Sequence, residues 1–463
     1  MDRGTWISKN SGYRGKRLFA SRIYQTLSLR DVKPDLEQIL ATQYWSTEQI
    51  REAQFRKIRS LLGHAYSHVP YYTNLFKRIG AHPEDITSLD LYSRLPALTK
   101  ALIREHSDQM IADNACSADR VANATGGSTG EPLQFFQDRR YLNSADAARL
   151  WGWYYMAGCR PGDTSAILWG AVRDVKADFT FPERLRDLLK FGEIAINAFN
   201  LSEDRIRNFL KWCTAIRPKI LRGYVSAVKE LASYVEREHV EFKALKAVIL
   251  CAEAVDSRTQ SYIEDVFKVR SYNSYGGREF SLTAIQCNAS SELHEVSLNN
   301  YIEFAHCSDP YSSNAKQLVL TNLNNYTMPF LRYEIGDLGI PGTPGTCKCG
   351  RGLPRIKNLI GRTTEIFTFG DGTKTAGEVF IHMLKDLSLQ EYQFVQTHPD
   401  RLALRTLVSI SPMQKDSIRQ RFRPLLPSGV VLDFEKVSAL TKTPTGKFRF
   451  VFSEIGKSKE QFQ

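Results

Sequence analysis

The 463-residue sequence lacks any apolar stretch long enough to cross a bilayer, and no apolar run follows its first basic residues as a secretory signal requires. Internal repeats and low-complexity tracts are also missing, which argues against a solenoid and against a disordered chain. No basic stretch is interleaved with aromatic residues, so we expect no nucleic-acid partner. Together these absences predict a globular protein of the cytoplasm that is not transmembrane.

Acidic residues are outnumbered: 62 Lys and Arg face 50 Asp and Glu, which leaves a net charge of +12. Such a charge suits polyanionic ligands such as nucleotides or coenzyme A, and it suits an anionic membrane surface equally, so charge alone does not choose. The imbalance is strongest at the N-terminus, where residues 1–45 form a basic arm. A solvated arm is the plain interpretation, and a peripheral membrane contact or a partner contact stays open.

Cysteine is sparse, with eight residues and no secretory signal, so we expect reduced thiols. Six residues separate Cys287 from His294, and one separates Cys347 from Cys349. Three thiols and one imidazole are a ligand set that structural zinc takes. Because 52 residues separate the two pairs, four unconnected residues are the alternative. The tight turn at Cys347–Gly350 is a poor place for idle buried cysteines, and we therefore expect a structural zinc.

Two parts of the chain differ in the pattern of their apolar residues. From about residue 160 to 330, apolar runs such as Ser165–Trp169 and Ala247–Leu250 alternate with amphipathic helical patterns, which predicts an α/β fold with a parallel sheet. Beyond Gly361 the pattern changes to short strands, with a hairpin turn at Gly370–Gly372. We therefore expect a large N-terminal multi-sheet α/β domain over 1–361 and a small, mobile C-terminal α+β domain over 362–463.

The segment from Thr125 to Pro132 holds three glycines, three hydroxyl side chains and a closing proline. Such a composition suits a loop that lays backbone N–H groups and hydroxyls against phosphates, and a structural Ser/Gly turn is the alternative. The Gly-Lys-Ser/Thr ending of a Walker-type loop is missing, which excludes the common ATPase interpretation. The candidate phosphate contacts are Gly126, Gly127, Ser128, Thr129 and Gly130.

Three further segments carry candidate ligands, each weak when taken alone. In Ser274–Glu279, Tyr275 lies next to Gly276 and could stack on a base, while Glu279 could hold Mg²⁺. In Phe330–Asp337, Asp337 could accept hydrogen bonds from ribose hydroxyls, although a surface strand explains this segment equally well. In Thr441–Lys447, a lysine after Pro-x-Gly could be delivered to a developing negative charge, although a solvent-facing lysine is the usual case.

In this order, the segments resemble the signature of the adenylate-forming superfamily, which includes acyl-CoA synthetases. Gly361-Arg362 matches the hinge of that family, and the match spans Thr125 to Lys447. Ala65–Tyr72, Leu95–Lys100 and Leu250–Ala254 resemble segments of the phenylacetate–CoA ligase-like branch, and in particular its members associated with capsular or extracellular polysaccharide biosynthesis. Some members of this branch carry a zinc with a similar Cys/His layout.

The resemblance implies that a carboxylic acid is joined to AMP at the expense of ATP and is then passed to an acyl acceptor, often coenzyme A. It implies catalytic roles for Lys447, Thr125 and Arg362, and a Mg²⁺ ligand in Glu279. It also implies ATP or AMP contacts for a larger set, which is Gly126, Gly127, Ser128, Thr129, Gly130, Ala252, Glu253, Tyr275, Gly276, Arg278 and Asp337. The small C-terminal domain is expected to swing between the two steps.

The sequence departs from the family pattern at three positions. Arg278 stands where the family usually has Thr, Glu131 where many members have Lys, and Thr364 where the hinge often has Asp. These departures put ordinary thioester formation in question. We therefore keep two alternatives, which are transfer of the acyl group to an amine or hydroxyl in envelope biosynthesis and a non-catalytic nucleotide-binding scaffold.

Overall fold

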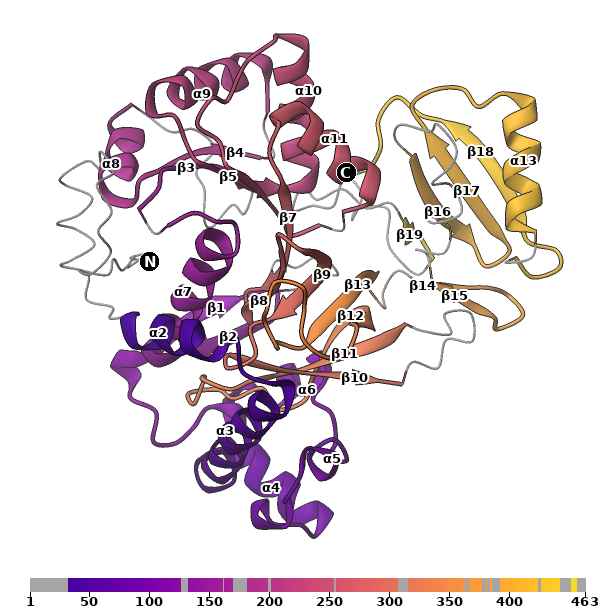
Figure 1. Ribbon diagram of the computed structural model, residues 1–463. Helices are drawn as coiled ribbons and strands as arrows, with labels where there is room; N and C mark the ends of the chain where they lie inside the picture. The colour runs from indigo at the N-terminus through magenta and orange to yellow at the C-terminus, as the bar shows by residue number, and fades with distance from the viewer. Residues whose placement is uncertain are drawn as a thin grey trace.

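The computed structural model describes residues 32–125, 132–160, 162–169, 181–198, 201–253, 255–306, 315–362, 366–376, 380, 384, 392–423, 426–441 and 451–455. An 11-stranded mixed sheet, in the order β10-β11-β12-β13-β9-β8-β7-β6-β5-β3-β4, runs through the large part of the molecule (Figure 1). It unites the alternating segments that the sequence predicted with antiparallel strands that follow them in the chain.

One half of this sheet is parallel, as the strand–helix alternation predicted. Its strands are β4 (Glu193–Asn197), β3 (Ser165–Trp169), β5 (Ile220–Tyr224), β6 (Ala247–Cys251) and β7 (Ser271–Gly277). The helices on this half are α8 (Phe181–Phe191), α9 (Glu203–Ile216), α10 (Val225–Arg237) and α11 (Ser257–Phe267). The apolar faces of α9 and α10 pack on one face of the strands in a single core, so the strands are buried and near-continuously hydrophobic.

In the other half of the sheet, neighbouring strands run antiparallel to each other. It contains β8 (Ser281–Cys287), β9 (Ser290–Glu295), β10 (Asn300–Ala305), β11 (Lys316–Asn322), β12 (Tyr333–Pro341) and β13 (Arg355–Arg362). A second core joins it to N-terminal helices and short 3₁₀ turns. The elements that contribute to this core are α3 (Thr47–His68), α4 (Pro70–Ile79), α5 (Leu89–Tyr92), α6 (Lys100–Glu105) and η2 (Ser107–Met110). The 3₁₀ turns η1 (Pro83–Asp85) and η3 (Ser117–Asp119) belong to the same stretch of chain.

A third core brings together elements that are distant in the sequence. It contains residues of α2 (Lys33–Thr42), of α7 (Arg139–Leu150) and of the π-helix η4 (Trp151–Tyr155), packed against strands of the large sheet. Gly152 makes this approach possible, because a Cβ at that position would overlap the Leu282 side chain. A separate antiparallel hairpin of β1 (Val121–Ala124) and β2 (Gln134–Gln137) precedes α7.

The C-terminal part has a sheet and a core of its own (Figure 1). The predicted hairpin at Gly370–Gly372 is confirmed, since the amide of Gly372 (φ +85°) donates to the carbonyl of Phe369. The elements are β14 (Ile366–Thr368), β15 (Lys374–Ala376), β16 (Tyr392–His398), β17 (Arg401–Thr406), α13 (Pro412–Phe422), β18 (Val431–Lys436) and β19 (Val451–Ser453). The sequence also favours a helix near 378–387, a stretch of which the structure describes only residues 380 and 384.

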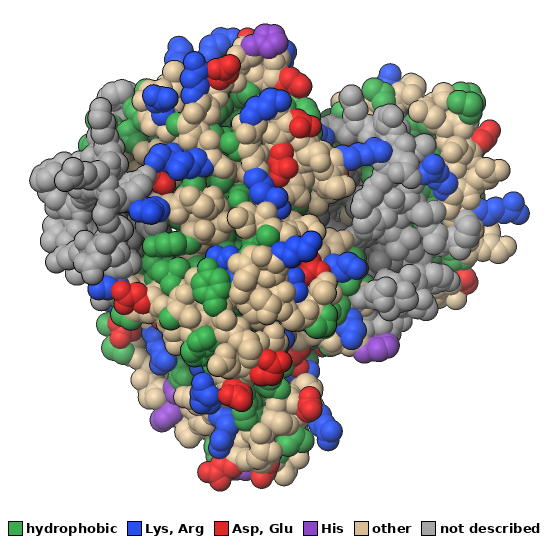
Figure 2. All heavy atoms as spheres, in the orientation of Figure 1, with side chains coloured by type: hydrophobic (Ala, Val, Ile, Leu, Met, Phe, Trp, Pro, Cys, Tyr) green, Lys and Arg blue, Asp and Glu red, His purple; other side chains and the backbone are tan. Residues whose placement is uncertain are grey.

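The surface was expected to carry an excess of positive charge. On the face seen in Figure 2, the Lys and Arg side chains of the described residues are interspersed with Asp and Glu. The positive charge of these residues is therefore distributed on this face rather than gathered in one strip. Among the helices that the structure describes, none combines the length and the apolar character that crossing a bilayer demands.

Candidate functional site

The parallel strands β5, β6 and β7 end at one edge of the sheet, which we call the carboxyl edge. Ligands of open α/β sheets bind outside the carboxyl ends of the strands. Ala252, a predicted nucleotide contact, follows β6 directly and has φ +67°, a left-handed conformation that is uncommon for a residue with a Cβ. The carboxyl edge therefore holds one predicted residue in an unusual backbone conformation.

Glu253, the next predicted contact, has a structural task that the sequence did not indicate. Its carboxylate accepts hydrogen bonds from the Ser226 amide at 2.7 Å and from the Ser226 hydroxyl at 3.0 Å. Ser226 lies in the first turn of α10, where unpaired amides and the helix dipole favour a negative charge. Glu253 thus caps α10 from a neighbouring loop, 27 residues away in the sequence.

The predicted residues Tyr275, Gly276, Arg278 and Glu279 lie on the hairpin between β7 and β8. Gly276 is required there, because a Cβ at this position would overlap the carbonyl oxygen of Ser281. The backbone of the turn is held from outside: its carbonyl groups accept hydrogen bonds from the side chains of Gln137 (2.8 Å), Tyr141 (3.2 Å) and Asn322 (3.3 Å). The hairpin is therefore fixed in position by three separate elements.

Tyr275 and Asp337 contact each other directly. The Tyr275 hydroxyl donates to Asp337 Oδ2 at 2.7 Å, across 62 residues of sequence. Asp337 of β12 is paired with Arg362 of β13 in the sheet. The backbone of the predicted hinge arginine therefore lies beside the predicted ribose contact. The structure thus brings three predicted residues to one place, although the side chain of Arg362 lies outside what the structure describes.

Thr125 closes the base of the glycine–hydroxyl loop. Its amide donates to the Leu133 carbonyl at 2.9 Å, and its hydroxyl accepts from the Leu133 amide at 2.9 Å. The loop therefore begins and ends on the hairpin of β1 and β2. The predicted contacts Gly126, Gly127, Ser128, Thr129 and Gly130, together with Glu131, lie outside the described residues.

Arg278 links the β7–β8 hairpin to the base of this loop. Its Nη1 donates to Asn123 Oδ1 at 3.3 Å, and Asn123 Nδ2 donates to Gln137 Oε1 at 3.0 Å. The sequence analysis missed Asn123 and Gln137. The available signal was their position, since each amide lies on a strand that flanks the loop.

Lys447 lies outside the described residues, but the segment that leads to it is anchored. The Gln393 amide group clamps the backbone of Thr441, donating to its carbonyl at 2.6 Å and accepting from its N–H at 2.8 Å. Gln393 is buried on β16. The chain thus enters the segment of the predicted catalytic lysine from a fixed point on the C-terminal sheet.

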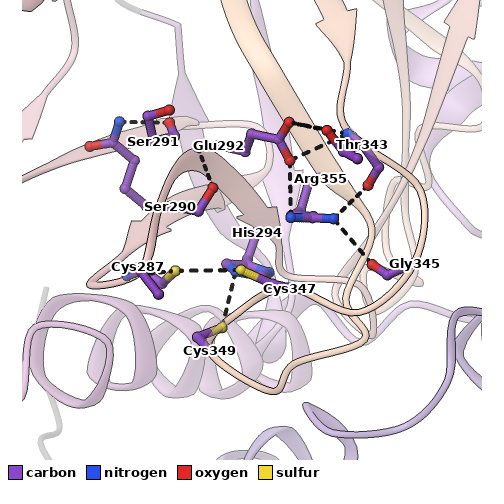
Figure 3. Close-up of polar contacts among 12 residues, drawn as sticks. Cys287, Ser290, Ser291, Glu292, His294, Thr343, Gly345, Cys347, Cys349 and Arg355 are labelled. Carbon is purple, nitrogen blue, oxygen red and sulfur yellow. Dashed lines mark hydrogen bonds and ion pairs between the residues drawn. The ribbon is translucent and has the colours of Figure 1, made fainter.

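The four predicted zinc ligands form one compact group, the Cys/His cluster (Cys287, His294, Cys347 and Cys349; Figure 3). Their ligand atoms all lie within 4.8 Å of one another. The Sγ atoms of Cys287 and Cys347 are 3.9 Å apart, and Cys349 Sγ lies 3.4 Å from His294 Nε2. A tetrahedral zinc separates two sulfur ligands by about 3.8 Å and sulfur from nitrogen by about 3.6 Å. The spacing of the cluster therefore fits one tetrahedral ion.

The surroundings of the cluster suit metal ligands. Burial, with help from Arg351 and Arg355, lowers the pKa of His294 to about 3, so its imidazole is neutral at physiological pH. Burial acts to raise the pKa of Cys349, but hydrogen bonds from Arg351 outweigh it and the pKa lies below its ordinary value. Burial raises the pKa of Cys287 to about 11, and the hydrogen bond that the Ala289 amide donates to Cys287 Sγ at 3.4 Å offsets only part of this rise.

The cluster lies beside the N-terminal helix. Gln43 Oε1 accepts hydrogen bonds both from Trp151 Nε1 of η4 (3.1 Å) and from Arg351 Nε of the cysteine turn (2.7 Å). Gly352 is needed in this turn, because a Cβ would overlap the carbonyl oxygen of Trp45. The cysteine turn is thereby tied to both the N-terminal segment and the π-helix, within the third core.

Comparison with known proteins places this geometry in a family. No protein-family model matches the sequence. The chain is 31% identical over 338 residues to a phenylacetate–coenzyme A ligase of Aromatoleum evansii, which covers 69% of this chain and 72% of the relative. It is 23% identical over 424 residues to the protein CapK of Staphylococcus aureus, covering 87% of this chain and 89% of that protein.

Solved structures agree on the fold. The structure matches a crystal structure of a 2-hydroxyisobutyryl-CoA ligase in its postadenylation state with a TM-score of 0.69 and 20% identity, covering 89% of this chain and 91% of the other. The predicted adenylate-forming fold is therefore confirmed. Together with the identity to the Aromatoleum evansii enzyme, this shows that the chain belongs to the phenylacetate–coenzyme A ligase-like branch of the adenylate-forming enzymes.

Proposed function

We propose that the protein is an AMP-forming ligase that activates a carboxylic acid with ATP and transfers the acyl group to coenzyme A. In the first step, a carboxylate oxygen attacks the α-phosphorus and the bond to pyrophosphate breaks. In the second step, the thiol sulfur attacks the acyl carbon, the bond to AMP breaks and the thiol proton is lost to solvent. Relatives named as phenylacetate–coenzyme A ligases support this chemistry.

The contact between Tyr275 and Asp337 is the observation that carries the proposal. The hydroxyl of Tyr275 restricts the rotation of the Asp337 carboxylate through a 2.7 Å hydrogen bond. We assign Asp337 to the ribose hydroxyls and the Tyr275 ring to the adenine, since a carboxylate accepts from a diol and an aromatic face stacks on a base. A nucleotide bound in this way extends its phosphates along the carboxyl edge of the sheet.

The remaining roles follow from charge. We assign Gly126–Gly130 to the β- and γ-phosphates, with Thr125 fixing the base of that loop through Leu133. We assign Lys447 to the negative charge that develops around the α-phosphorus. Arg278, which donates to Asn123 beside the base of the loop, would add a positive charge to this phosphate site.

Two metal ions complete the proposal. The Glu279 carboxylate lies on the hairpin turn beside Gly277, and we assign it to Mg²⁺, which takes one or two carboxylates when it is bound to phosphates. We assign zinc to the Cys/His cluster. Its four protein ligands leave no open coordination position, so the role of zinc there is to hold β8, β9 and the cysteine turn together.

We further propose that the C-terminal part, 362–463, moves as a domain. Its separate core supports a boundary at 361/362, where β13 ends next to Asp337. Rotation about Arg362 would carry Lys447 toward the carboxyl edge for adenylation and away from it for transfer.

A release assay tests the function. Purified protein with ATP, Mg²⁺ and a panel of carboxylic acids should release pyrophosphate only when an acid is present, and addition of coenzyme A should yield AMP and a thioester. A panel that yields no pyrophosphate with coenzyme A or with amine acceptors would rule the proposal out. The positive charge of Arg278 favours a second candidate acceptor, an amine or hydroxyl on an anionic sugar precursor. Turnover that persists without coenzyme A would select that alternative.

A further inference from the structure

The hairpin of β1 and β2 carries both ends of the proposed phosphate loop, at Thr125 and Leu133. Among the strands that the structure describes, none of the large sheet pairs with it, and it forms a two-stranded sheet of its own. A hairpin of two strands is only marginally stable by itself. Groups that bind a ligand have to be held to within about 0.5 Å, so the contacts that fix this hairpin also decide where the loop starts and ends.

A closed ring of hydrogen bonds joins this hairpin to the turn between β7 and β8. Arg278 Nη1 donates to Asn123 Oδ1 at 3.3 Å, and Asn123 Nδ2 donates to Gln137 Oε1 at 3.0 Å. Gln137 Nε2 then donates to the backbone carbonyl of Arg278 at 2.8 Å. The series of contacts starts and ends on the same residue. We call these three residues (Asn123, Gln137 and Arg278) the amide ring.

Asn123 and Gln137 supply the amide groups of the ring from the two strands of the hairpin. Asn123 lies on β1, and its Oδ1 also accepts a hydrogen bond from the Ala124 amide at 2.8 Å. Gln137 ends β2 and is buried, and both its oxygen and its nitrogen have partners within the ring. A buried amide that loses one partner is costly, so the ring holds Gln137 in one orientation.

Arg278 supplies the other side of the ring from the nucleotide turn. The turn follows Tyr275, assigned above to the adenine, and continues into Glu279, assigned to Mg²⁺. The ring holds Arg278 both by its guanidinium and by its backbone carbonyl. Two attachments on one residue restrict the direction of the link as well as its length. The ring therefore sets the position of the nucleotide turn relative to the base of the phosphate loop.

A second set of contacts holds the end of β2 from another side. Asn325 Nδ2 donates to the Phe136 carbonyl at 2.9 Å. The Asp138 carboxylate accepts from the amides of Tyr326 at 2.9 Å and Thr327 at 3.2 Å. These contacts lead to the segment that follows β11, whereas the amide ring reaches the nucleotide turn directly. Loss of the ring should therefore shift the hairpin relative to that turn without detaching β2 from the protein.

We propose that Asn123 and Gln137 are positioning residues for ATP, which hold the base of the phosphate loop at the separation from the nucleotide turn that a triphosphate spans. This inference rests on the proposed nucleotide-binding function. AMP has no β- and γ-phosphates, which are the groups assigned to the loop. The amide ring therefore strengthens the binding of ATP and leaves the binding of AMP nearly unchanged.

Calorimetric titration with ATP and Mg²⁺, and separately with AMP, tests the inference in the wild type, Asn123→Ala and Gln137→Met. We expect the Kd for ATP to rise about tenfold in either variant, because each breaks the ring at two hydrogen bonds. The Kd for AMP should change by less than about twofold. The double variant should bind ATP about as weakly as either single variant, because residues that act through one ring have effects that do not add.

Gln54→Met is the matched control, since Gln54 is a buried amide on α3 that donates to the carbonyls of Ser297 (2.8 Å) and Asn300 (3.1 Å), outside the ring. It should keep the wild-type ratio of the two dissociation constants. A merely structural role of Asn123 would weaken both nucleotides alike or neither, and either result in Asn123→Ala would overturn the inference. If Gln137→Met does not fold, Asn123→Ala decides the test alone, because Asn123 is partly exposed.

The same titrations separate this inference from the proposed function. A wild type that binds neither ATP nor AMP would overturn the nucleotide-binding function, and the positioning role would fall with it. A wild type that binds ATP but releases no pyrophosphate with any acid would overturn the ligase activity only, and the ratio of the dissociation constants would still decide the role of the ring. A wild type that binds both nucleotides, with the same ratio in Asn123→Ala, would overturn the positioning role alone.

Discussion

The carboxyl edge and the Cys/His cluster differ in where their chemical groups find partners. In the cluster, four ligand atoms lie within 4.8 Å of one another and converge on one point. At the carboxyl edge, Tyr275 and Arg278 come from the β7–β8 hairpin and Asp337 from β12, and each is fixed by a contact with a different part of the protein. The comparison therefore separates a compact group whose proposed role is to hold the fold from a set of residues whose proposed role is to bind the nucleotide.

Loss of one cluster ligand should give the largest effect and sharpen this comparison. In Cys349→Ser, the zinc content should fall from about one per chain to well below one. The free energy of unfolding should drop by about 5 kcal/mol, because metal binding and folding are coupled. Metal analysis and thermal unfolding of purified protein measure both quantities.

Cys116→Ser is the matched control, since Cys116 is an exposed free thiol outside the cluster. It should leave the metal content and the unfolding temperature unchanged. Wild-type protein that holds well under one zinc per chain would contradict the assignment of the cluster. A Cys349→Ser protein that is stable but chemically inactive would break the distinction between the two regions.

The second largest effect is expected at Lys447 and concerns the rate of adenylation rather than stability. Lys447→Ala should lower the rate of acyl-adenylate formation about 10³-fold, because a charge that stabilises the transition state is lost, while ATP binding is largely kept. Pyrophosphate release measures the rate of acyl-adenylate formation, and calorimetry measures ATP binding. Lys436→Ala, an exposed lysine on β18, should have no effect, and an unchanged rate in Lys447→Ala would remove this lysine from the mechanism.

A smaller effect is expected at the nucleotide contact. Asp337→Asn should lower kcat/KM for ATP about 30-fold, which corresponds to about 2 kcal/mol for a charge-assisted hydrogen bond, with little change in stability. Glu334→Gln on the same strand is the control and should stay near the wild-type value. An Asp337→Asn protein with normal ATP kinetics but a lowered unfolding temperature would place Asp337 with the structural groups instead.

The parts of the molecule that the sequence predicted well depend on local rules. The capping boxes at Ser46 and Ser411 each involve residues only three positions apart, so a short sequence pattern specifies them. The buried strands β3 and β6 follow from continuous apolar runs. The chemistry of the zinc ligands also predicted their assembly, although Cys287 and Cys347 are 60 residues apart.

The parts that the sequence did not reveal depend on long-range contacts. Glu253 stays a predicted nucleotide contact, but no local spacing indicates that its carboxylate caps α10. Gln43 joins Trp151 to Arg351 across more than 100 residues on one side and more than 300 on the other, and no spacing encodes such a bridge. Arg222 was hidden inside a strand pattern, because only the register of β5 between Ile167 and Ile249 shows that it is buried.

The smallest predicted effect concerns Glu295, and it tests whether the buried carboxylate beside the cluster destabilises the folded protein. Glu295 follows the ligand His294, is fully buried, and has neither carboxylate oxygen in a hydrogen bond with the described residues. Burial raises the pKa of Glu295 to about 7. The folded chain therefore keeps this proton to a higher pH than the unfolded chain, and stability declines as the pH rises from the unfolded pKa of 4.5 through the folded pKa.

Glu295→Gln removes this dependence while keeping the shape of the side chain. At pH 8, we expect the zinc-loaded variant to be more stable than the wild type by about 1.5 kcal/mol, and at pH 4 we expect the two to be nearly equal, because the wild-type carboxyl is then protonated in both states. Denaturant unfolding at the two pH values measures the difference. A variant that is less stable than the wild type at pH 8 would mean that the Glu295 carboxylate stabilises the folded protein. Glu295 would then belong, together with the four metal ligands, to the group that holds the fold.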